Sequence, residues 1–91
     1  MKRLKNVRTM EQILDKSLDA VEGLQKALEQ YRAVLPDLER LEKYYESPQW
    51  QQDYEEAPDF QKATKCGVLS EDTVYDLLTA RDQLLKELKD L

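Results

Sequence analysis

The sequence predicts an all-α protein built on one long helix. Between Val7 and Leu35, apolar side chains recur at alternating steps of three and four residues, which is the spacing of helices that pack along a heptad seam. The composition is rich in Leu, Glu, Lys, Asp and Gln, with 2 Gly and 3 Pro among 91 residues, as in helical proteins. A chain of this length is expected to form a single helical domain over residues 1–91.

The seam is the predicted interface of the long helix. Its candidate interface residues are Val7, Met10, Leu14, Val21, Leu24, Leu28 and Tyr31. Ser17 is the one polar residue in the run, and a third apolar row lies beside it: Ile13, Ala20, Ala27 and Val34. Three apolar positions in seven make a face wide enough for two neighbouring helices.

The first helix is predicted over about residues 6–46, with Asn6 or Thr9 as its N-cap. Pro36 interrupts it, because proline cannot donate to the carbonyl four residues back. The apolar pattern resumes at once, and no Gly, Asn or Ser lies nearby to make a turn. We therefore expect a kink at Pro36, and a reversal of the chain there is the alternative.

A short second helix is predicted over about residues 48–56, because Ser47 is a good N-cap and Pro48 suits the first helical position. Aromatic residues gather around it, and with one ring of the last helix they form the candidate binding cluster: Tyr44, Tyr45, Trp50, Tyr54 and Tyr75. One interpretation is a pocket for a ligand or peptide. The other is that these rings close the end of a thin bundle, each burying its body and keeping its polar tip wet.

The stretch 57–69 is predicted to be a loop. Its acidic neighbours lack the spacing and central glycine of a calcium loop. Cys66 has only Lys62 and Lys65 nearby to lower the pKa of its thiol, so an unreactive cysteine is expected.

The last helix is predicted over about residues 71–90. Ser70 is its N-cap, and acidic residues follow in the first turn. Leu69 and Val74 are spaced as a hydrophobic staple. Arg81 falls within the apolar stripe, where its stem can lie on the core with its charged head at the rim.

The two long helices differ in length. The first would be on the order of 60 Å long and the last near 30 Å, at 1.5 Å per residue. One copy of the last helix, packed back as a hairpin, cannot cover the whole seam. We therefore expect the bundle to be completed by dimerisation, or by another helical protein.

Charge and residue types restrict the function. The chain has a net charge of −5 and no histidine. Its first eight residues carry four positive charges and no negative one, so the rest is strongly acidic, which argues against nucleic acid as a partner. No metal, cofactor or catalytic residue is predicted, since the commonest metal ligand and general base is missing. The apolar runs are too short for a membrane span, and one cysteine fits a reducing, cytoplasmic location.

Several motifs resemble those of one family. They are Tyr44-Tyr45-x-Ser47-x-x-Trp50, Asp53-Tyr54-Glu55, Gly67-Val68-Leu69-Ser70-Glu71-Asp72 and Val74-Tyr75-Asp76-Leu77-Leu78, with Met10-Glu11-x-Ile13-Leu14-Asp15 near the start. These motifs look like those of small bacterial helical proteins catalogued only as a domain of unknown function. The resemblance implies a bacterial, cytoplasmic, all-helical protein, and it implies no activity.

Three functional hypotheses remain. The first is a protein interaction or assembly module, motivated by the seam and the length mismatch. The second is a small dimeric helical enzyme acting on an anionic metabolite, similar to the all-helical chorismate mutases; its candidate residues are Arg32, Arg40, Lys43, Tyr75, Asp76 and Arg81. The third is a secreted Trp-x-Gly effector, which is disfavoured because Gln52 stands where the glycine should be. The first hypothesis is the one that we expect.

Overall fold

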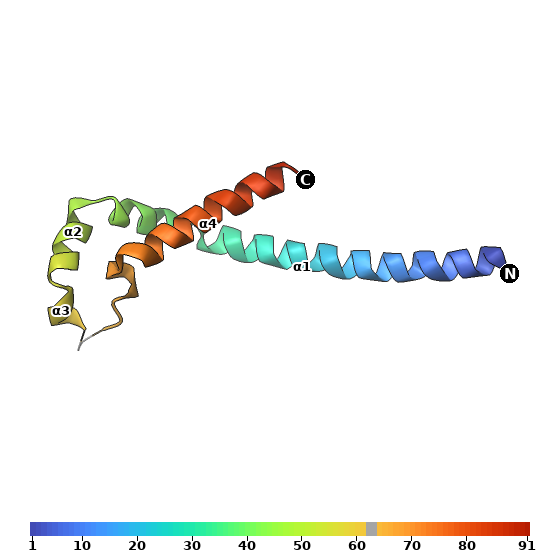
Figure 1. Ribbon diagram of the computed structural model, residues 1–91, viewed down its shortest axis with the longest axis horizontal. Helices are drawn as coiled ribbons and strands as arrows, with labels where there is room; N and C mark the ends of the chain where they lie inside the picture. Colours follow the sequence, from blue (N-terminus) through green and yellow to red (C-terminus); the bar gives the residue numbers. More distant parts are fainter. Residues whose placement is uncertain (62–63) are drawn as a thin grey trace. The chain divides into compact units, whose positions relative to one another are not determined.

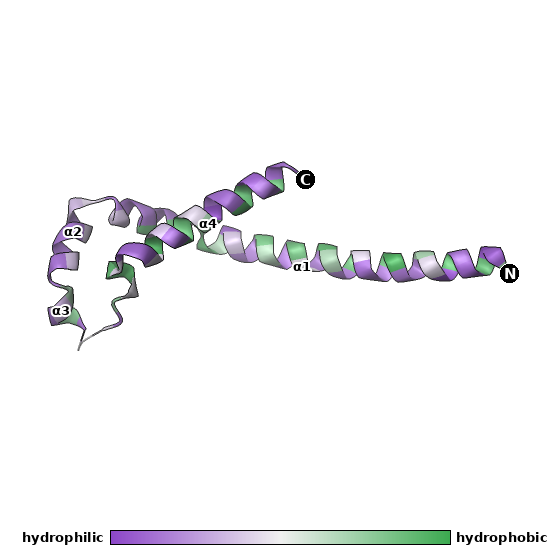
Figure 2. Cartoon of the chain, in the orientation of Figure 1, coloured by the Kyte–Doolittle hydropathy of each residue, from purple (hydrophilic) through white to green (hydrophobic). Residues whose placement is uncertain are grey.

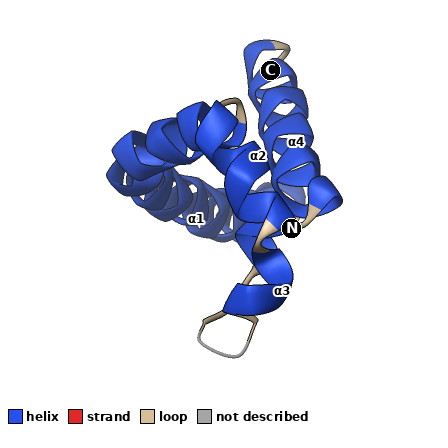
Figure 3. Ribbon diagram, turned by 90° about the vertical axis from the view of Figure 1, so that its left-hand side faces the viewer, coloured by secondary structure: helices blue, strands red, loops and turns tan. Residues whose placement is uncertain are grey.

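The structure, a computed structural model, describes residues 1–61 and 64–91. Every regular element in these residues is a helix, in the order α1, α2, α3, a short 3-10 helix η1, and α4 (Figures 1 and 3). The chain divides into two compact units, residues 1–36 and residues 37–91. The predicted fold class is confirmed: a long helix is followed by shorter helices and a C-terminal helix.

Helix α1 spans Lys2–Tyr45 and has 44 residues. It begins earlier than the predicted residue 6. Thr9 does not cap it, because its hydroxyl lies within the helix and donates to the Lys5 carbonyl at 3.1 Å. Pro36 is inside the helix, so the chain continues there and does not reverse.

Helix α2 spans Pro48–Glu55. Its start follows the sequence signal, since the backbone N–H of Trp50 donates to the Ser47 hydroxyl at 3.3 Å and Pro48 occupies the first turn. The N-cap hydrogen bond satisfies one of the backbone donors that a helix start leaves unpaired.

The stretch 57–69 contains two short helices where the sequence predicted only a loop. Helix α3 spans Ala57–Phe60 and η1 spans Gly67–Leu69. Pro58 lies in the first turn of α3, a position where its missing N–H costs nothing. Elements of four and three residues are too short to show a periodic pattern, so the sequence could not reveal them. Lys62 lies outside the described residues.

Helix α4 spans Glu71–Lys89. Ser70 has the extended backbone of an N-cap, although its side chain makes no capping hydrogen bond. Glu71 and Asp72 bring negative charge to the first turn, which favours the positive end of the helix dipole.

The core of the second unit is small. Leu38 of α1, Leu69 of η1 and Val74 of α4 are its buried apolar residues among those described, with 8%, 8% and 2% of their surface exposed. Leu69 and Val74 are the pair predicted to form the hydrophobic staple, and both are buried. In the part of the chain that the structure describes, no helix is long and apolar enough to cross a membrane.

Candidate functional site

The first candidate site is the apolar side of α1 in the first unit. Hydrophobic residues recur along this stretch between polar ones (Figure 2). Ten large apolar side chains are each 43–64% exposed, and we call them the apolar face of α1: Leu4, Val7, Met10, Ile13, Leu14, Leu18, Val21, Leu24, Leu28 and Val34. Residues 1–36 hold one helix and no other element, so nothing within this unit covers these side chains.

The structure places six of the seven predicted interface residues on the apolar face, and the seventh, Tyr31, is half-buried. Sequence reasoning missed Leu4 and Leu18, which widen the face. Leu18 lies four residues after Leu14 and three before Val21, so helical spacing alone could have found it.

Two polar interactions of the first unit are made within α1 itself. The Ser17 hydroxyl, the polar position of the seam, donates to the Ile13 carbonyl at 2.7 Å. It therefore brings no unpaired donor to an apolar surface. Lys26 and Glu22 form an exposed ion pair at 3.3 Å, one helical turn apart, which adds a few tenths of a kcal/mol.

The second candidate site is the aromatic cluster of the second unit. Trp50 lies between two tyrosines. Its ring centroid is 5.2 Å from that of Tyr45 in an edge-on arrangement, and 5.2 Å from that of Tyr54 in a stacked one. Both are favourable geometries for aromatic pairs. The three rings therefore pack mainly against each other.

The polar atoms of these rings already have partners within the chain. Trp50 Nε1 donates to the Val68 carbonyl at 2.9 Å. The Tyr54 hydroxyl donates to Glu71 Oε1 at 2.7 Å, and the Tyr45 hydroxyl donates to the Glu71 carbonyl at 3.3 Å. These bonds join α1 and α2 to η1 and to the first residue of α4. The cluster thus acts as a structural joint, which supports the bundle-closing interpretation.

Tyr44 faces another partner. Its hydroxyl donates to Asp53 Oδ2 at 2.6 Å, and Gln49 Nε2 donates to the other oxygen of that carboxylate at 2.9 Å. The pKa of Tyr44 is raised to about 12, first by burial of its hydroxyl and then by the hydrogen bond to the Asp53 carboxylate and by its negative charge. The Tyr54 pKa is also raised, chiefly by its hydrogen bond to Glu71.

Tyr75 does not belong with the other rings, contrary to the prediction. It is 60% exposed and makes no aromatic pair or side-chain hydrogen bond among the described residues. The physical reason is helical geometry: Tyr75 follows Val74, the most buried residue, and the next position on a helix points about 100° away.

Arg81 links α4 to the end of α1. Its guanidinium lies 2.7 Å from Glu42 Oε2 and 2.9 Å from Asp82 Oδ1. The Arg81 side chain is 19% exposed, and its pKa is raised by the hydrogen bonds to Glu42 and then to Asp82. The predicted geometry, with the stem inside and the head at the rim, agrees with this position.

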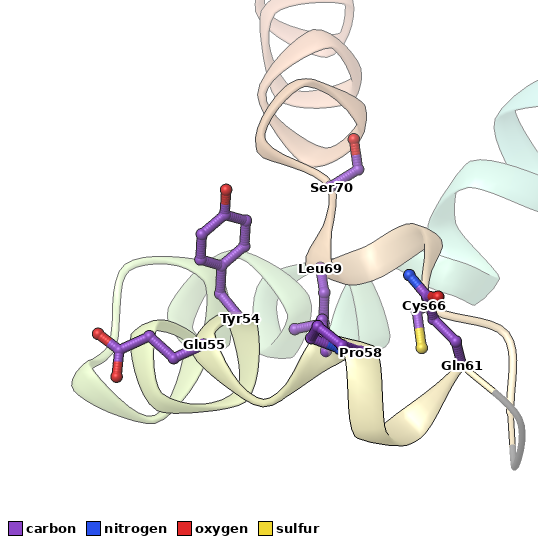
Figure 4. Close-up of a pocket in the computed structure, with 8 residues that line it drawn as sticks. Tyr54, Glu55, Pro58, Gln61, Cys66, Leu69 and Ser70 are labelled. Carbon is purple, nitrogen blue, oxygen red and sulfur yellow. The ribbon is translucent and has the colours of Figure 1, made fainter.

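An open cleft of about 490 Å³ lies beside the cluster (Figure 4). Its labelled lining residues come from α2, from α3 with the residue that follows it, and from the stretch that leads into α4: Tyr54, Glu55, Pro58, Gln61, Cys66, Leu69 and Ser70. The Cys66 thiol is half-buried and its only described partner is the Thr64 carbonyl, 3.5 Å away. Nothing in this lining converges on a reactive centre.

Comparison with known proteins identifies a family. Residues 7–91 match the family described as a domain of unknown function, DUF4298. No curated protein and no solved structure matches the chain. The chain therefore belongs to this family, and the predicted family resemblance is confirmed.

Proposed function

We propose that this member of the family is a protein interaction module that assembles with a second copy of itself through the apolar face of α1. The observation that carries the proposal is the half-exposure of all ten large side chains of that face. A contiguous apolar surface of this kind marks an interaction site, and its heptad spacing suits another helix.

The energy available from this face supports association. Burying one large apolar side chain contributes about 1.5–3 kcal/mol, so covering ten half-exposed ones contributes on the order of 10 kcal/mol per copy. The free energy gained by burying both apolar faces together exceeds the free-energy cost of association, which is about 4–15 kcal/mol. We expect this assembly in the cytoplasm, where Cys66 would stay reduced.

The competing proposal is a small dimeric enzyme for an anionic metabolite. Such an enzyme needs cations that are free to converge on the substrate. Arg81, one of the candidates, is already engaged by Glu42 and Asp82, and Tyr75 is exposed away from the other rings. These positions favour the interaction module.

The test is the molar mass by light scattering after size exclusion, over a roughly hundredfold concentration range, because dimerisation obeys mass action. We expect a dimer that Leu24→Lys dissociates. Two leucines leave the interface in each dimer, so the dissociation constant should rise about a hundredfold or more.

The matched control is Gln30→Lys, which adds the same charge to an exposed position away from the seam. It should leave the dimer intact. A monomer at every concentration, or equal dissociation by Leu24→Lys and Gln30→Lys, would contradict the proposal.

A further inference from the structure

We infer that the two copies pair antiparallel along α1. The two-fold axis passes between the two helices at the level of residue 19. This inference rests on the proposed function and adds the orientation and register of the two helices. Four seam layers are then repeated twice: Val7 opposite Tyr31 of the second copy, Met10 opposite Leu28, Leu14 opposite Leu24, and Ser17 opposite Val21. All seven predicted interface residues lie in these layers.

Charge favours the antiparallel orientation. The cations Lys2, Arg3, Lys5 and Arg8 lie in the first two turns of α1 with no acidic residue among them. A parallel, in-register pair would bring eight such charges together at one end. In the antiparallel pair the two clusters lie about 40 Å apart along the axis, several times the screening length of about 8 Å at physiological salt.

The sizes of the seam residues favour it as well. A parallel pair stacks identical residues, so Ser17 would meet Ser17 in a hollow layer and Tyr31 would meet Tyr31 in a crowded one. The antiparallel pair sets Tyr31 against the smaller Val7, and Ser17 against Val21. Layers of more even volume pack at native density without voids or strain.

Leu18 fixes the register. It stands on the seam's flank, and the residues of α1 before Pro36 that share its heptad position are Leu4, Glu11, Gln25 and Arg32, so the positions one heptad away on either side are polar. Leu18 is 59% exposed, so the other residues of α1 leave more than half of its surface uncovered. With the axis at the level of residue 19, Leu18 meets Leu18 of the second copy. A shift by one heptad sets Leu18 against Gln25 or Glu11.

The opposite flank agrees with the same register. There Ala20 meets Ala20 of the second copy, and Ile13 meets Ala27. The small residues Ala20 and Ala27 let the two helices approach closely, and the large Ile13 faces one of them. The two Pro36 residues would then lie about 50 Å apart along the pair, so each copy of residues 37–91 starts from an opposite end.

Spin-label distances in the full chain test this arrangement. On a Cys66→Ser background, nitroxide labels are placed singly at Lys16→Cys and Gln30→Cys. Both positions are exposed and share one heptad position on the outer side of α1, so their lateral geometry is matched. We expect axial separations between the two copies of about 9 Å for residue 16 and about 33 Å for residue 30.

The outcomes separate the inference from the proposed function. Equal short distances at the two positions mean a parallel pair. A one-heptad shift gives axial components near 20 Å at both positions when it goes one way, and about 2 Å for residue 16 with about 44 Å for residue 30 when it goes the other way. Each of these results overturns the inference and leaves the dimer standing. Absence of any intermolecular distance, with a monomeric mass by light scattering, overturns the proposed function itself.

Discussion

The two units of this chain are held by different kinds of contact. In residues 37–91, side chains from four helical elements meet: Trp50 reaches the Val68 carbonyl, Tyr54 reaches Glu71, and Arg81 reaches Glu42. In residues 1–36 one helix carries the apolar face, and the hydrogen bonds given by its side chains return to its own backbone. The second unit is held by contacts distant in sequence, and the first by local ones.

The two units therefore differ in where their stability comes from. Isolated helices are marginal in water, and most helical stability in proteins comes from packing an apolar side. Residues 37–91 pack such sides within one chain, although only Leu38, Leu69 and Val74 are strongly buried among the described residues of this unit. Residues 1–36 hold a single helix, so the same stabilisation has to come from outside this unit, and the proposed second copy would supply it. Perturbing one unit should therefore leave the other largely intact.

The largest expected effect is that of Trp50→Ala on the second unit. The substitution removes both ring contacts and the hydrogen bond to Val68. We expect the free energy of unfolding of residues 37–91 to fall by about 2–4 kcal/mol. Circular dichroism during urea unfolding measures this loss, and light scattering should still show the dimer.

Tyr75→Ala is the matched control for that experiment, because it also truncates an aromatic ring, but one that is 60% exposed. Its effect should stay within about 0.5 kcal/mol, as for most surface substitutions. Equal destabilisation by the two variants would show that the Trp50 ring does not hold the second unit together. Loss of the dimer in Trp50→Ala would show that the two units are not stabilised independently.

A smaller effect is expected at high pH, again in the second unit. The pKa of Tyr44 is about 12 in the folded chain and about 10 when unfolded. Between these values the folded state holds a proton that the unfolded state has lost. Tyr44 therefore stabilises the fold fully below pH 10, and this contribution is lost as the pH rises toward 12.

The measurement compares wild type and Tyr44→Phe in urea unfolding at pH 9 and above pH 11. The free energy of unfolding of the wild type should fall by about 1–2 kcal/mol more than that of the variant over this range. This figure is smaller than the full pKa shift implies, because solvent screens a half-buried group. Tyr75→Phe serves as the control, since its hydroxyl has no partner among the described residues. If Tyr44→Phe loses as much stability with pH as wild type, folding does not raise the pKa of Tyr44.

Local signals in the sequence predicted much of this fold. The Ser47-Pro48 pair fixes the start of α2 through one hydrogen bond to Trp50, and this bond depends only on neighbouring residues. The apolar period of α1 likewise survives Pro36, so the helix continues through it. The face of α1 was predicted from spacing alone, with the exceptions of Leu4 and Leu18.

Features that depend on distant residues were not predictable. The bond from Trp50 to Val68 joins residues 18 positions apart, and no local pattern specifies it. The sequence places Tyr75 among the aromatic candidates, but the direction of its side chain follows from the burial of Val74. The Ser70 side chain makes no cap bond even though the residue type and position suit one.

The smallest effect belongs to the first unit. Gly23 lies inside α1, and a Cβ added there meets nothing within 4 Å. Gly23→Ala should therefore stabilise α1 by about 1 kcal/mol per copy, since glycine in a helix loses more backbone freedom than alanine. Circular dichroism should record a higher unfolding midpoint, while the fluorescence of Trp50, the chain's one tryptophan, should report an unchanged midpoint for the second unit. Ala33→Gly, at another exposed position of the same helix, should shift the first midpoint the opposite way. If the two probes instead move together in both variants, the units unfold as one, and α1 transmits stability through Pro36.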